Sequence, residues 1–265
     1  MHVTPSELRI LRQDGIQIRF ALLGELAYVH AEVPATGSDG TSLETPCTRP
    51  HWGFVLDGEV AVEVDGRTRP IPPGSAFHIP PGGPEHRFRV VGAARVAGFE
   101  PIDPTLDTSD AGLSARGFVV AASESSGTTS TSVVLPVGRP VLDPTKIEAR
   151  TWPMSTYVLT EARFGPGSGY LNDWCDVPHW GLVTVGRLAM EWEDDVEILA
   201  AGDIYHCPAG PPGHRLEAAD PAAVVDLTPI AALATGGRLA PWRASTGNVG
   251  AKVEAREGVA VAGLG

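Results

Sequence analysis

The stretch PHWGFVLDGEV, residues 50–60, decides the fold, because it returns as PHWGLVTVGRL at residues 178–188. Pro50 and Pro178 are 128 residues apart, and identical residues recur at this spacing over much of each half. The recurring pairs include Cys47 and Cys175, His51 and His179, Gly58 and Gly186, Gly74 and Gly202, His78 and His206, and His86 and His214. A match of this length in one register indicates two copies of one structural module.

Each copy has the pattern of short β-strands joined by tight turns. Val60, Val62 and Val64 occupy every second position, as in a strand with one buried face. Asp-Gly pairs at residues 57–58 and 65–66 predict hairpin turns on both sides of this strand. The 31 Gly and 24 Pro favour many turns over long helices. We therefore expect an all-β chain with two antiparallel barrels of the jelly-roll type.

The composition predicts four segments and a location. We expect an N-terminal domain at residues 1–125, a Ser/Thr/Gly-rich linker at 126–142, a C-terminal domain at 143–235 and a Gly/Ala-rich extension at 236–265. The sequence shows no apolar run of membrane-spanning length, and its first residues, MHVTPSELRILRQDG, lack the apolar core of a signal peptide. These features predict a cytoplasmic protein that does not bind membranes.

The net charge indicates which kinds of partner the protein binds, and the cysteine count indicates whether disulfides hold the fold. A net charge of −12 makes the surface acidic, which disfavours nucleic acid because like charges repel the phosphate backbone. The expected partner is a small-molecule ligand or substrate, and a homodimer is compatible with the sequence. Cys47, Cys175 and Cys207 are too few for a disulfide framework.

The turn-rich part of each copy resembles the second motif of the cupin superfamily, G-x5-P-x-G-x2-H, with one extra residue before the histidine. The matching residues are Gly74, Pro80, Gly82 and His86 in the first copy and Gly202, Pro208, Gly210 and His214 in the second. This resemblance implies a bicupin, which is two tandem double-stranded β-helix barrels.

The first cupin motif, H-x-H-x3-4-E-x6-G, is similar to the preceding stretch but with different ligand residues. Gly58 and Gly186 match its final glycine, His51 and His179 stand at its glutamate, and Cys47 and Cys175 stand at its second histidine. Thr45 and Asp173 stand at its first histidine, so that ligand is missing. The resemblance implies a Cys-x3-His … His set in place of the usual His/Glu set. Cupins include dioxygenases, decarboxylases, isomerases, cyclases, storage proteins and sensors, so the motifs do not define one activity.

The predicted metal ligands are Cys47, His51 and His86, and again Cys175, His179 and His214. Residues four apart on one strand share a face, which would bring Cys47 and His51 together, and His86 follows on another strand. A single histidine in a barrel is more often a packing residue than a ligand. Here the whole set recurs at the family's ligand positions, which favours a metal. A thiolate with two imidazoles suits Zn2+, with Fe2+ or Cu2+ as alternatives.

His78, His206 and Glu85 are the candidate catalytic residues. The two histidines recur in both copies, and each would serve either as a fourth ligand or as a general acid or base beside the metal. Glu85 has no counterpart because Gly213 stands in its place, so it would act in one site only.

Other residues near the motifs have simpler interpretations. Trp52 and Trp180 are expected to pack, Arg87 and Arg215 to point outward and form salt bridges, and Cys207 to be a packing thiol that faces away from the site. Tyr170, Asp173 and Trp174 would stand at the barrel mouth, in contact with substrate or only with solvent.

Two classes of function fit these features. The first is a zinc- or iron-dependent enzyme acting on a small organic molecule, such as a secondary-metabolite intermediate, by cyclisation, isomerisation, hydrolysis or decarboxylation. The second is a non-catalytic protein that binds or senses a metal or small molecule. An iron- or copper-dependent dioxygenase is a further alternative. A site with an open coordination position would favour an enzyme over a sensor.

Overall fold

The computed structural model describes residues 2–13, 15–35, 41–42, 46–102, 105, 107–115, 119–121, 146–169, 174–192, 195–235 and 259–260. The chain forms two compact units, one of residues 7–124 with 257–265 and one of residues 1–6 with 125–256. We call these units the N-terminal barrel and the C-terminal barrel. The expected linker at 126–142 and most of the expected extension at 236–265 lie outside the described residues.

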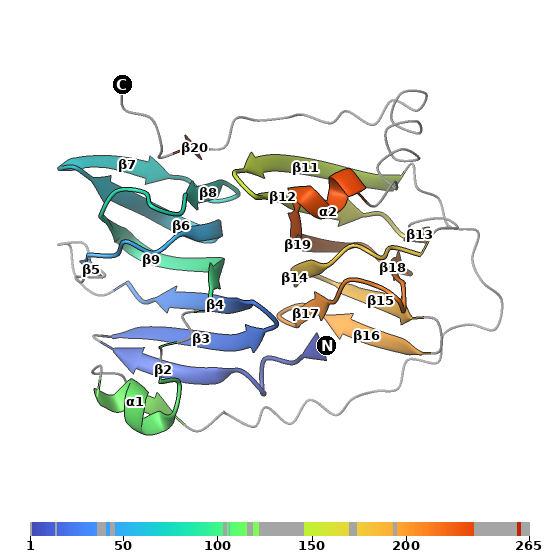
Figure 1. Ribbon diagram of the computed structural model, residues 1–265, viewed down its shortest axis with the longest axis horizontal. Coiled ribbons are helices and arrows are strands. Elements are labelled where there is room, and N and C mark those ends of the chain that lie inside the picture. The colour runs from blue at the N-terminus through green and yellow to red at the C-terminus, as the bar shows by residue number, and fades with distance from the viewer. Residues whose placement is uncertain are drawn as a thin grey trace. The chain divides into compact units, whose positions relative to one another are not determined.

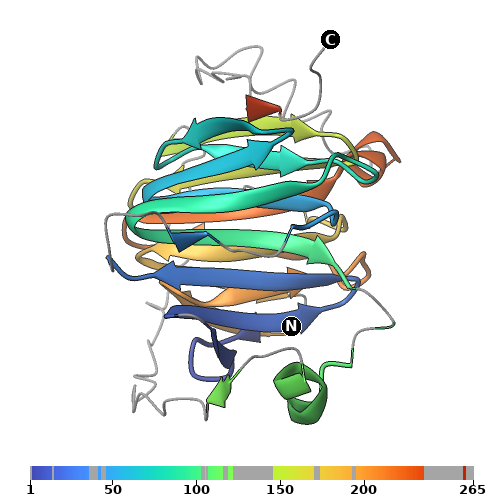
Figure 2. The ribbon, with the colours of Figure 1, turned by 90° about the vertical axis from the view of Figure 1, so that its left-hand side faces the viewer.

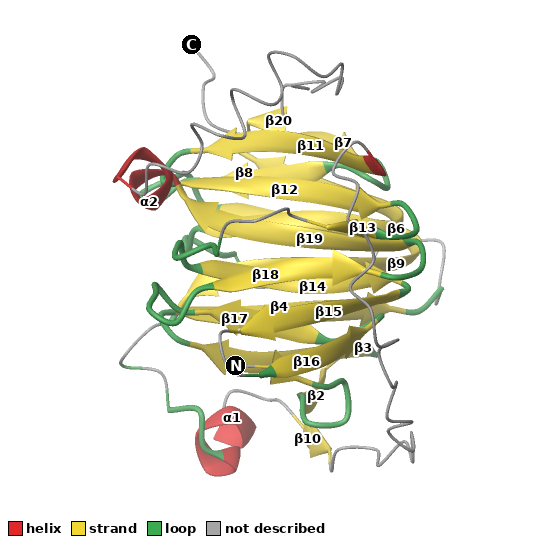
Figure 3. Ribbon diagram, turned by 90° about the vertical axis from the view of Figure 1, so that its right-hand side faces the viewer, coloured by secondary structure: helices red, strands yellow, loops and turns green. Residues whose placement is uncertain are grey.

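Strands dominate both units, as the sequence predicts (Figures 1 and 3). Among the described residues the helices are α1 (Asp110–Ala115) and α2 (Ile230–Thr235). Neither helix is long and apolar enough to cross a membrane.

The N-terminal barrel is built on one continuous ladder of strands in the order β10-β2-β3-β4-β9-β6-β8-β20, with β7 also paired to β6 and β5 to β9. Its strands are β2 (Arg9–Gln13), β3 (Ile16–Leu23), β4 (Leu26–Val33), β5 (Thr41–Ser42), β6 (His51–Val64), β7 (Arg67–Ile71), β8 (Ala76–Ile79), β9 (His86–Pro101), β10 (Val119–Ala121) and β20 (Val259–Ala260). The long strands β6 and β9 run antiparallel along most of their length (Figure 2).

The C-terminal barrel has two sheets, in the orders β1-β17-β14-β19-β12-β11 and β13-β18-β15-β16. Its strands are β1 (His2–Val3), β11 (Ile147–Met154), β12 (Tyr157–Phe164), β13 (Ser168–Gly169), β14 (His179–Val185), β15 (Arg187–Trp192), β16 (Val196–Ala200), β17 (Ile204–Cys207), β18 (His214–Ala218) and β19 (Ala222–Pro229). The start of the chain belongs to this unit, because β1 pairs with β17 and His2 forms an ion pair with Asp203.

The two Asp-Gly pairs differ in structure. Asp65 and Gly66 both have positive φ and form the turn between β6 and β7, as predicted. The predicted hairpin at Asp57-Gly58 is wrong, because β6 continues through it with a shift of register against β9. Gly58 has φ of +75°, and a Cβ there would lie 2.1 Å from the Ala93 carbonyl oxygen. Gly58 therefore lies in a β-bulge and in close contact with the neighbouring backbone. Like a hairpin turn, this position requires a positive φ, and the close contact leaves no room for a side chain.

Apolar side chains fill the interior of each barrel. Val60, Val62 and Val64 are buried in the core of the N-terminal barrel as predicted, but Ala61 between them is buried as well. Leu188 and Met190 occupy the same role in the C-terminal barrel, and Trp192 packs against that core. At about 25 cal/mol for each Å² of apolar surface removed from water, such cores are the main stabilisation of each unit.

Candidate metal centre

Backbone pairing brings the cysteine and the third ligand candidate together in each barrel. Cys47 and His86 exchange two hydrogen bonds, each with N to O at 2.9 Å, so the two residues lie directly opposite one another. Cys175 and His214 do the same at 2.8 and 2.9 Å. Directly opposed residues project side chains to the same face, which aims each cysteine at its histidine.

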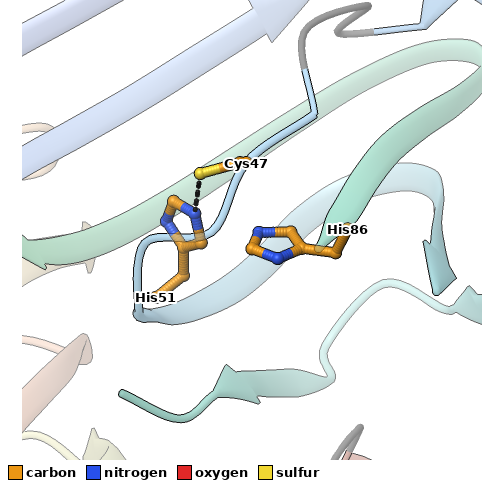
Figure 4. Close-up of side chains that lie close together, drawn as sticks. All are labelled: Cys47, His51 and His86. Atoms are coloured by element: carbon orange, nitrogen blue, oxygen red, sulfur yellow. Dashed lines mark hydrogen bonds between the residues drawn. The ribbon is translucent and has the colours of Figure 1, made fainter. Parts of the chain in front are cut away.

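The second ligand candidate arrives by a bend, and this corrects the sequence analysis. Cys47 was expected on one strand with His51, but it forms an isolated bridge, and β6 begins only at His51. The bend between them turns His51 back toward the sulfur, and Cys47 Sγ lies 3.2 Å from His51 Nε2 (Figure 4). Cys175 Sγ lies 3.1 Å from His179 Nε2. The convergence is as expected, but its cause is a turn rather than strand periodicity.

Each cluster places its three donor atoms close together. The ligand atoms of Cys47, His51 and His86 all lie within 4.8 Å of one another, and so do those of Cys175, His179 and His214. The imidazole rings are almost perpendicular, at 88° in the N-terminal barrel and 85° in the C-terminal barrel. Sulfur and nitrogen donors at these separations match the first coordination shell of a transition metal.

A carboxylate supports the histidine of the N-terminal cluster. His51 Nδ1 donates to Glu100 Oε1 at 3.0 Å, which aims Nε2 at the cluster. Burial lowers the pKa of His51, but the hydrogen bonds and charges of Cys47 and Glu100 outweigh it and raise the pKa to about 9. Glu100 Oε2 also pairs with Arg49 Nη2 at 3.1 Å.

A different carboxylate supports the C-terminal cluster. His179 Nδ1 lies 2.9 Å from Asp226 Oδ1 and 2.8 Å from Thr228 Oγ1. Asp226 Oδ2 accepts a hydrogen bond from Tyr205 Oη at 2.9 Å. Although burial lowers the pKa of His179, the charge and hydrogen bond of Asp226 raise it to about 10. Burial opposes ionisation of Asp226, yet His179 and the hydroxyl donors hold its pKa below the usual value.

The third histidine of each cluster has a nitrogen without a partner. His86 Nδ1 donates to the Pro84 carbonyl oxygen at 3.1 Å, so its Nε2 carries the lone pair. His86 Nε2 is buried and has no hydrogen-bond partner among the described residues, and the same holds for His214 Nδ1. Burial and the charge of His179 lower the pKa of His214 to about 3, so this ring is neutral. A buried nitrogen without a partner is costly unless something binds it.

The cysteine of the N-terminal cluster ionises easily. Burial raises the pKa of Cys47, but the hydrogen bonds of His51 and the Arg49 backbone amide, together with the nearby His86 ring, outweigh it and lower the pKa to about 6. A thiolate is the form of cysteine that binds metal. The residues therefore fit a metal ion by donor type, by spacing and by their unpartnered nitrogen, in a region with carboxylate-supported histidines.

Comparisons with known proteins identify the architecture. Residues 51–99 match the family model described as a cupin domain. The AerE protein from Microcystis aeruginosa is 11% identical over 84% of this chain and 98% of that chain, with a TM-score of 0.57. Oxalate decarboxylase from Lactobacillus farciminis is 13% identical over 86% of both chains, with a TM-score of 0.60. The chain folds as two tandem cupin barrels.

A second oxalate decarboxylase is also similar to this chain in structure. Oxalate decarboxylase OxdC from Bacillus subtilis is 15% identical over 86% of this chain and 77% of that chain, with a TM-score of 0.59. No curated protein matches the chain in sequence. At these identities the likeness establishes the cupin fold and leaves the reaction open.

His78 and His206 do not join the clusters of the cupin barrels. His78 lies directly opposite Trp52 across β6 and β8 and stacks on it, with ring centroids 6.0 Å apart. Because successive strand residues point to opposite faces, Trp52 and His78 lie on the face away from His51. His206 stacks on Trp180 at 5.0 Å in the same way. The expectation of a fourth ligand or an acid–base group beside the metal is therefore not supported by their placement.

The remaining sequence-based residues take varied positions. Glu85 is exposed and lies outside the cluster. Arg215 pairs with Glu191 at 2.5 Å and stacks on Trp174, which confirms the predicted salt bridge. Cys207 is a packing thiol as expected, but it does not face away from the site, because it lies directly opposite His179 on the same face of the sheet. Thr45, Tyr170 and Asp173 lie outside the described residues.

Sequence analysis missed the supporting carboxylates. Glu100 and Asp226 do not match in the repeat, since Thr228 stands 128 residues after Glu100 and Gly98 stands 128 before Asp226. The spacing of the repeat therefore gives no sign of either carboxylate. The available signal is a single carboxylate within or at the end of an otherwise apolar strand, as in AAVVDLTP of β19. Such a residue needs a buried partner, and each cluster supplies one.

Proposed function

We propose that each cupin barrel binds one transition-metal ion through its Cys-His-His cluster, and that the protein is a metal-dependent enzyme acting on a small organic molecule. The observation that carries the proposal is the same set of three donor atoms within 4.8 Å in both barrels. The buried, unpartnered Nε2 of His86 supports it independently in the N-terminal barrel. A packing role would not require this nitrogen to remain without a partner.

Zinc is the metal that best fits the donors. A thiolate and two imidazoles form a borderline-soft set that suits Zn2+, whereas Mn2+ favours carboxylate and water oxygens. The Bacillus subtilis oxalate decarboxylase that shares the fold has Mn(II) centres, which makes manganese the natural competitor in an assay. The cysteine sulfur is the donor that favours Zn2+ over Mn2+ here. Fe2+ is the next best fit to these donors.

The number and exposure of the donors favour an enzyme over a closed binding site. Among the described residues, each barrel brings three donor residues together. Cys47 and His51 are both partly exposed, while His86 is buried, so each site has a solvent side and an inner side. Three protein ligands with one position left for water or substrate is the pattern of catalytic zinc sites.

The protein's own residues would orient the ligands and keep the inner side dry. Glu100 and Asp226 fix the Nδ1–H tautomers of His51 and His179, so both Nε2 atoms face the cluster. Phe88 packs edge-on against both rings of the N-terminal cluster. Bound there, a zinc ion would supply Lewis acidity for hydrolysis, isomerisation, cyclisation or decarboxylation. A secondary-metabolite intermediate is one candidate substrate.

Cobalt substitution tests this function. We expect apo-protein reconstituted with Co2+ to show a thiolate-to-cobalt charge-transfer band and the visible spectrum of a four- or five-coordinate ion. Added azide should change the visible bands if a position is open to small molecules. A charge-transfer band that azide leaves unchanged would favour a sensor or binding protein, and absence of the band would refute cysteine ligation.

A further inference from the structure

We infer that the two metal centres are unequal, with the C-terminal centre binding a divalent metal more tightly because of the residues behind its histidine. This inference rests on the proposed function and goes beyond it. The donor residues are the same in both centres, so the proposed function alone predicts no difference between them. The difference lies in four positions of the repeat. Arg49, Phe77, Gly98 and Glu100 of the N-terminal barrel correspond to Val177, Tyr205, Asp226 and Thr228 of the C-terminal barrel.

In the N-terminal centre a cation shares the supporting carboxylate. Glu100 accepts from His51 through Oε1 at 3.0 Å and from Arg49 through Oε2 at 3.1 Å. Arg49 Nη2 also donates to the Pro101 carbonyl oxygen at 3.0 Å, which fixes the guanidinium beside the cluster. An arginine is always charged, so Glu100 gives less of its negative charge to His51. His51 is then a weaker donor, and the nearby cation opposes a second cation.

In the C-terminal centre an apolar residue takes the place of Arg49. Val177 stands where Arg49 stands and is 5% exposed. Asp226 is held instead by neutral hydroxyls, Tyr205 Oη at 2.9 Å and Thr228 Oγ1 at 2.9 Å. These donors satisfy the buried carboxylate without cancelling its charge, so it keeps a full charge toward His179.

The paired substitutions form a consistent set. A Cβ at Gly181 would lie 2.0 Å from Tyr205 Cζ, so the phenol ring lies directly over this glycine. Phe77 lies over Gly53 in the same way, with 2.2 Å to Cζ, but its ring carries no hydroxyl and position 98 carries no carboxylate. Tyr205 and Asp226 therefore occur together and are both missing from the other barrel. With both cysteines bound to metal as thiolates, the N-terminal set of Cys47, Glu100 and Arg49 carries one net negative charge, whereas the C-terminal set of Cys175 and Asp226 carries two.

Variants that keep one centre each test the inference. Cys175→Ala leaves the N-terminal centre, and Cys47→Ala leaves the C-terminal centre. Competition with a chromophoric chelator then gives the Zn2+ affinity of each. We expect the C-terminal centre to bind about 10- to 100-fold more tightly, the usual size of such supporting effects.

Further substitutions in these backgrounds assign the cause. Arg49→Met should tighten the N-terminal centre by about 10-fold, and Tyr205→Phe should loosen the C-terminal centre by about 10-fold. Arg89→Met is the matched control, because Arg89 lies in the same barrel but pairs with Glu63. The Co2+ charge-transfer energy should move with Arg49→Met and stay fixed with Arg89→Met.

The outcomes separate this inference from the proposed function. Equal affinities in the two single-centre variants would overturn the inference and leave metal binding intact. An N-terminal centre that Arg49→Met does not tighten would also overturn it. If neither variant binds Zn2+ or Co2+ while circular dichroism shows that both are folded, the proposed metal binding itself is wrong, and the inference is wrong with it.

Discussion

Cys207 lies directly opposite His179 across β14 and β17, yet its sulfur packs against Met190 Sδ at 3.9 Å. Burial raises the pKa of Cys207 well above its usual value, so the thiol stays protonated and is a poor ligand. The matching position in the N-terminal barrel is the buried Ile79. The C-terminal barrel thus contains a cysteine beside the cluster that packing explains, and it serves as a control for Cys47 and Cys175, which we propose bind metal.

Removal of metal should destabilise the protein reversibly. A ligand that binds only the folded state adds about 2.7 kcal/mol when its free concentration is 100 times Kd. For domains of this size we expect the melting temperature to fall by about 5–10 °C after chelation and to recover with Zn2+. Mg2+ should not restore it, because a thiolate and imidazoles bind Mg2+ poorly. A melting curve that chelation leaves unchanged would contradict the account.

Neutralising a supporting carboxylate should weaken its own centre. Glu100→Gln and Asp226→Asn keep the side-chain shape but remove the charge that each histidine faces. Each should lower the metal affinity of its barrel by about 10- to 100-fold, measured by chelator competition. Glu63→Gln is the control, because Glu63 pairs with Arg89 rather than with a cluster histidine.

The repeat predicted which residues form the two Cys-His-His clusters, because their positions are shared by both copies and match a family motif. The direction of His78 could not be predicted the same way, since it depends on whether β8 pairs Trp52 with residue 78 or with residue 79. A one-residue change of register reverses every side chain. The hairpin predicted at Asp57-Gly58 was wrong because a glycine with positive φ occurs in β-bulges as well as in hairpin turns.

The metal-free N-terminal cluster should contain a thiolate at neutral pH. Cys47 has a lowered pKa of about 6 and His51 a raised pKa of about 9, so their ion pair stabilises the fold between these values. The stabilisation is lost below pH 6 as Cys47 takes a proton, and above pH 9 as His51 loses one.

Alkylation of metal-free Cys175→Ala protein measures this directly. The iodoacetamide rate should rise with a midpoint near pH 6, and His51→Gln should move that midpoint upward. A midpoint at the ordinary value of 9.0 in the unsubstituted cluster would show that the pair does not form.

Adding a methyl group at the glycine under Tyr205 should affect both stability and metal binding. Gly181→Ala places a Cβ 2.0 Å from the ring, so Tyr205 must move from Asp226. Overpacking of this kind costs about 1–3 kcal/mol, measurable by urea unfolding. Gly53→Ala crowds Phe77 similarly and should cost similar stability. Because Phe77 contacts no supporting carboxylate through a hydroxyl, its N-terminal centre should keep its metal affinity.

Metal content of cysteine variants tests the central claim most directly. Untagged protein should contain one to two transition-metal ions per chain by elemental analysis, with zinc the most abundant. The double variant Cys47→Ala with Cys175→Ala should contain almost none, while Cys207→Ala should retain the full amount despite its lost core packing. Equal metal content in the double variant and the unsubstituted protein would contradict the assignment of both centres.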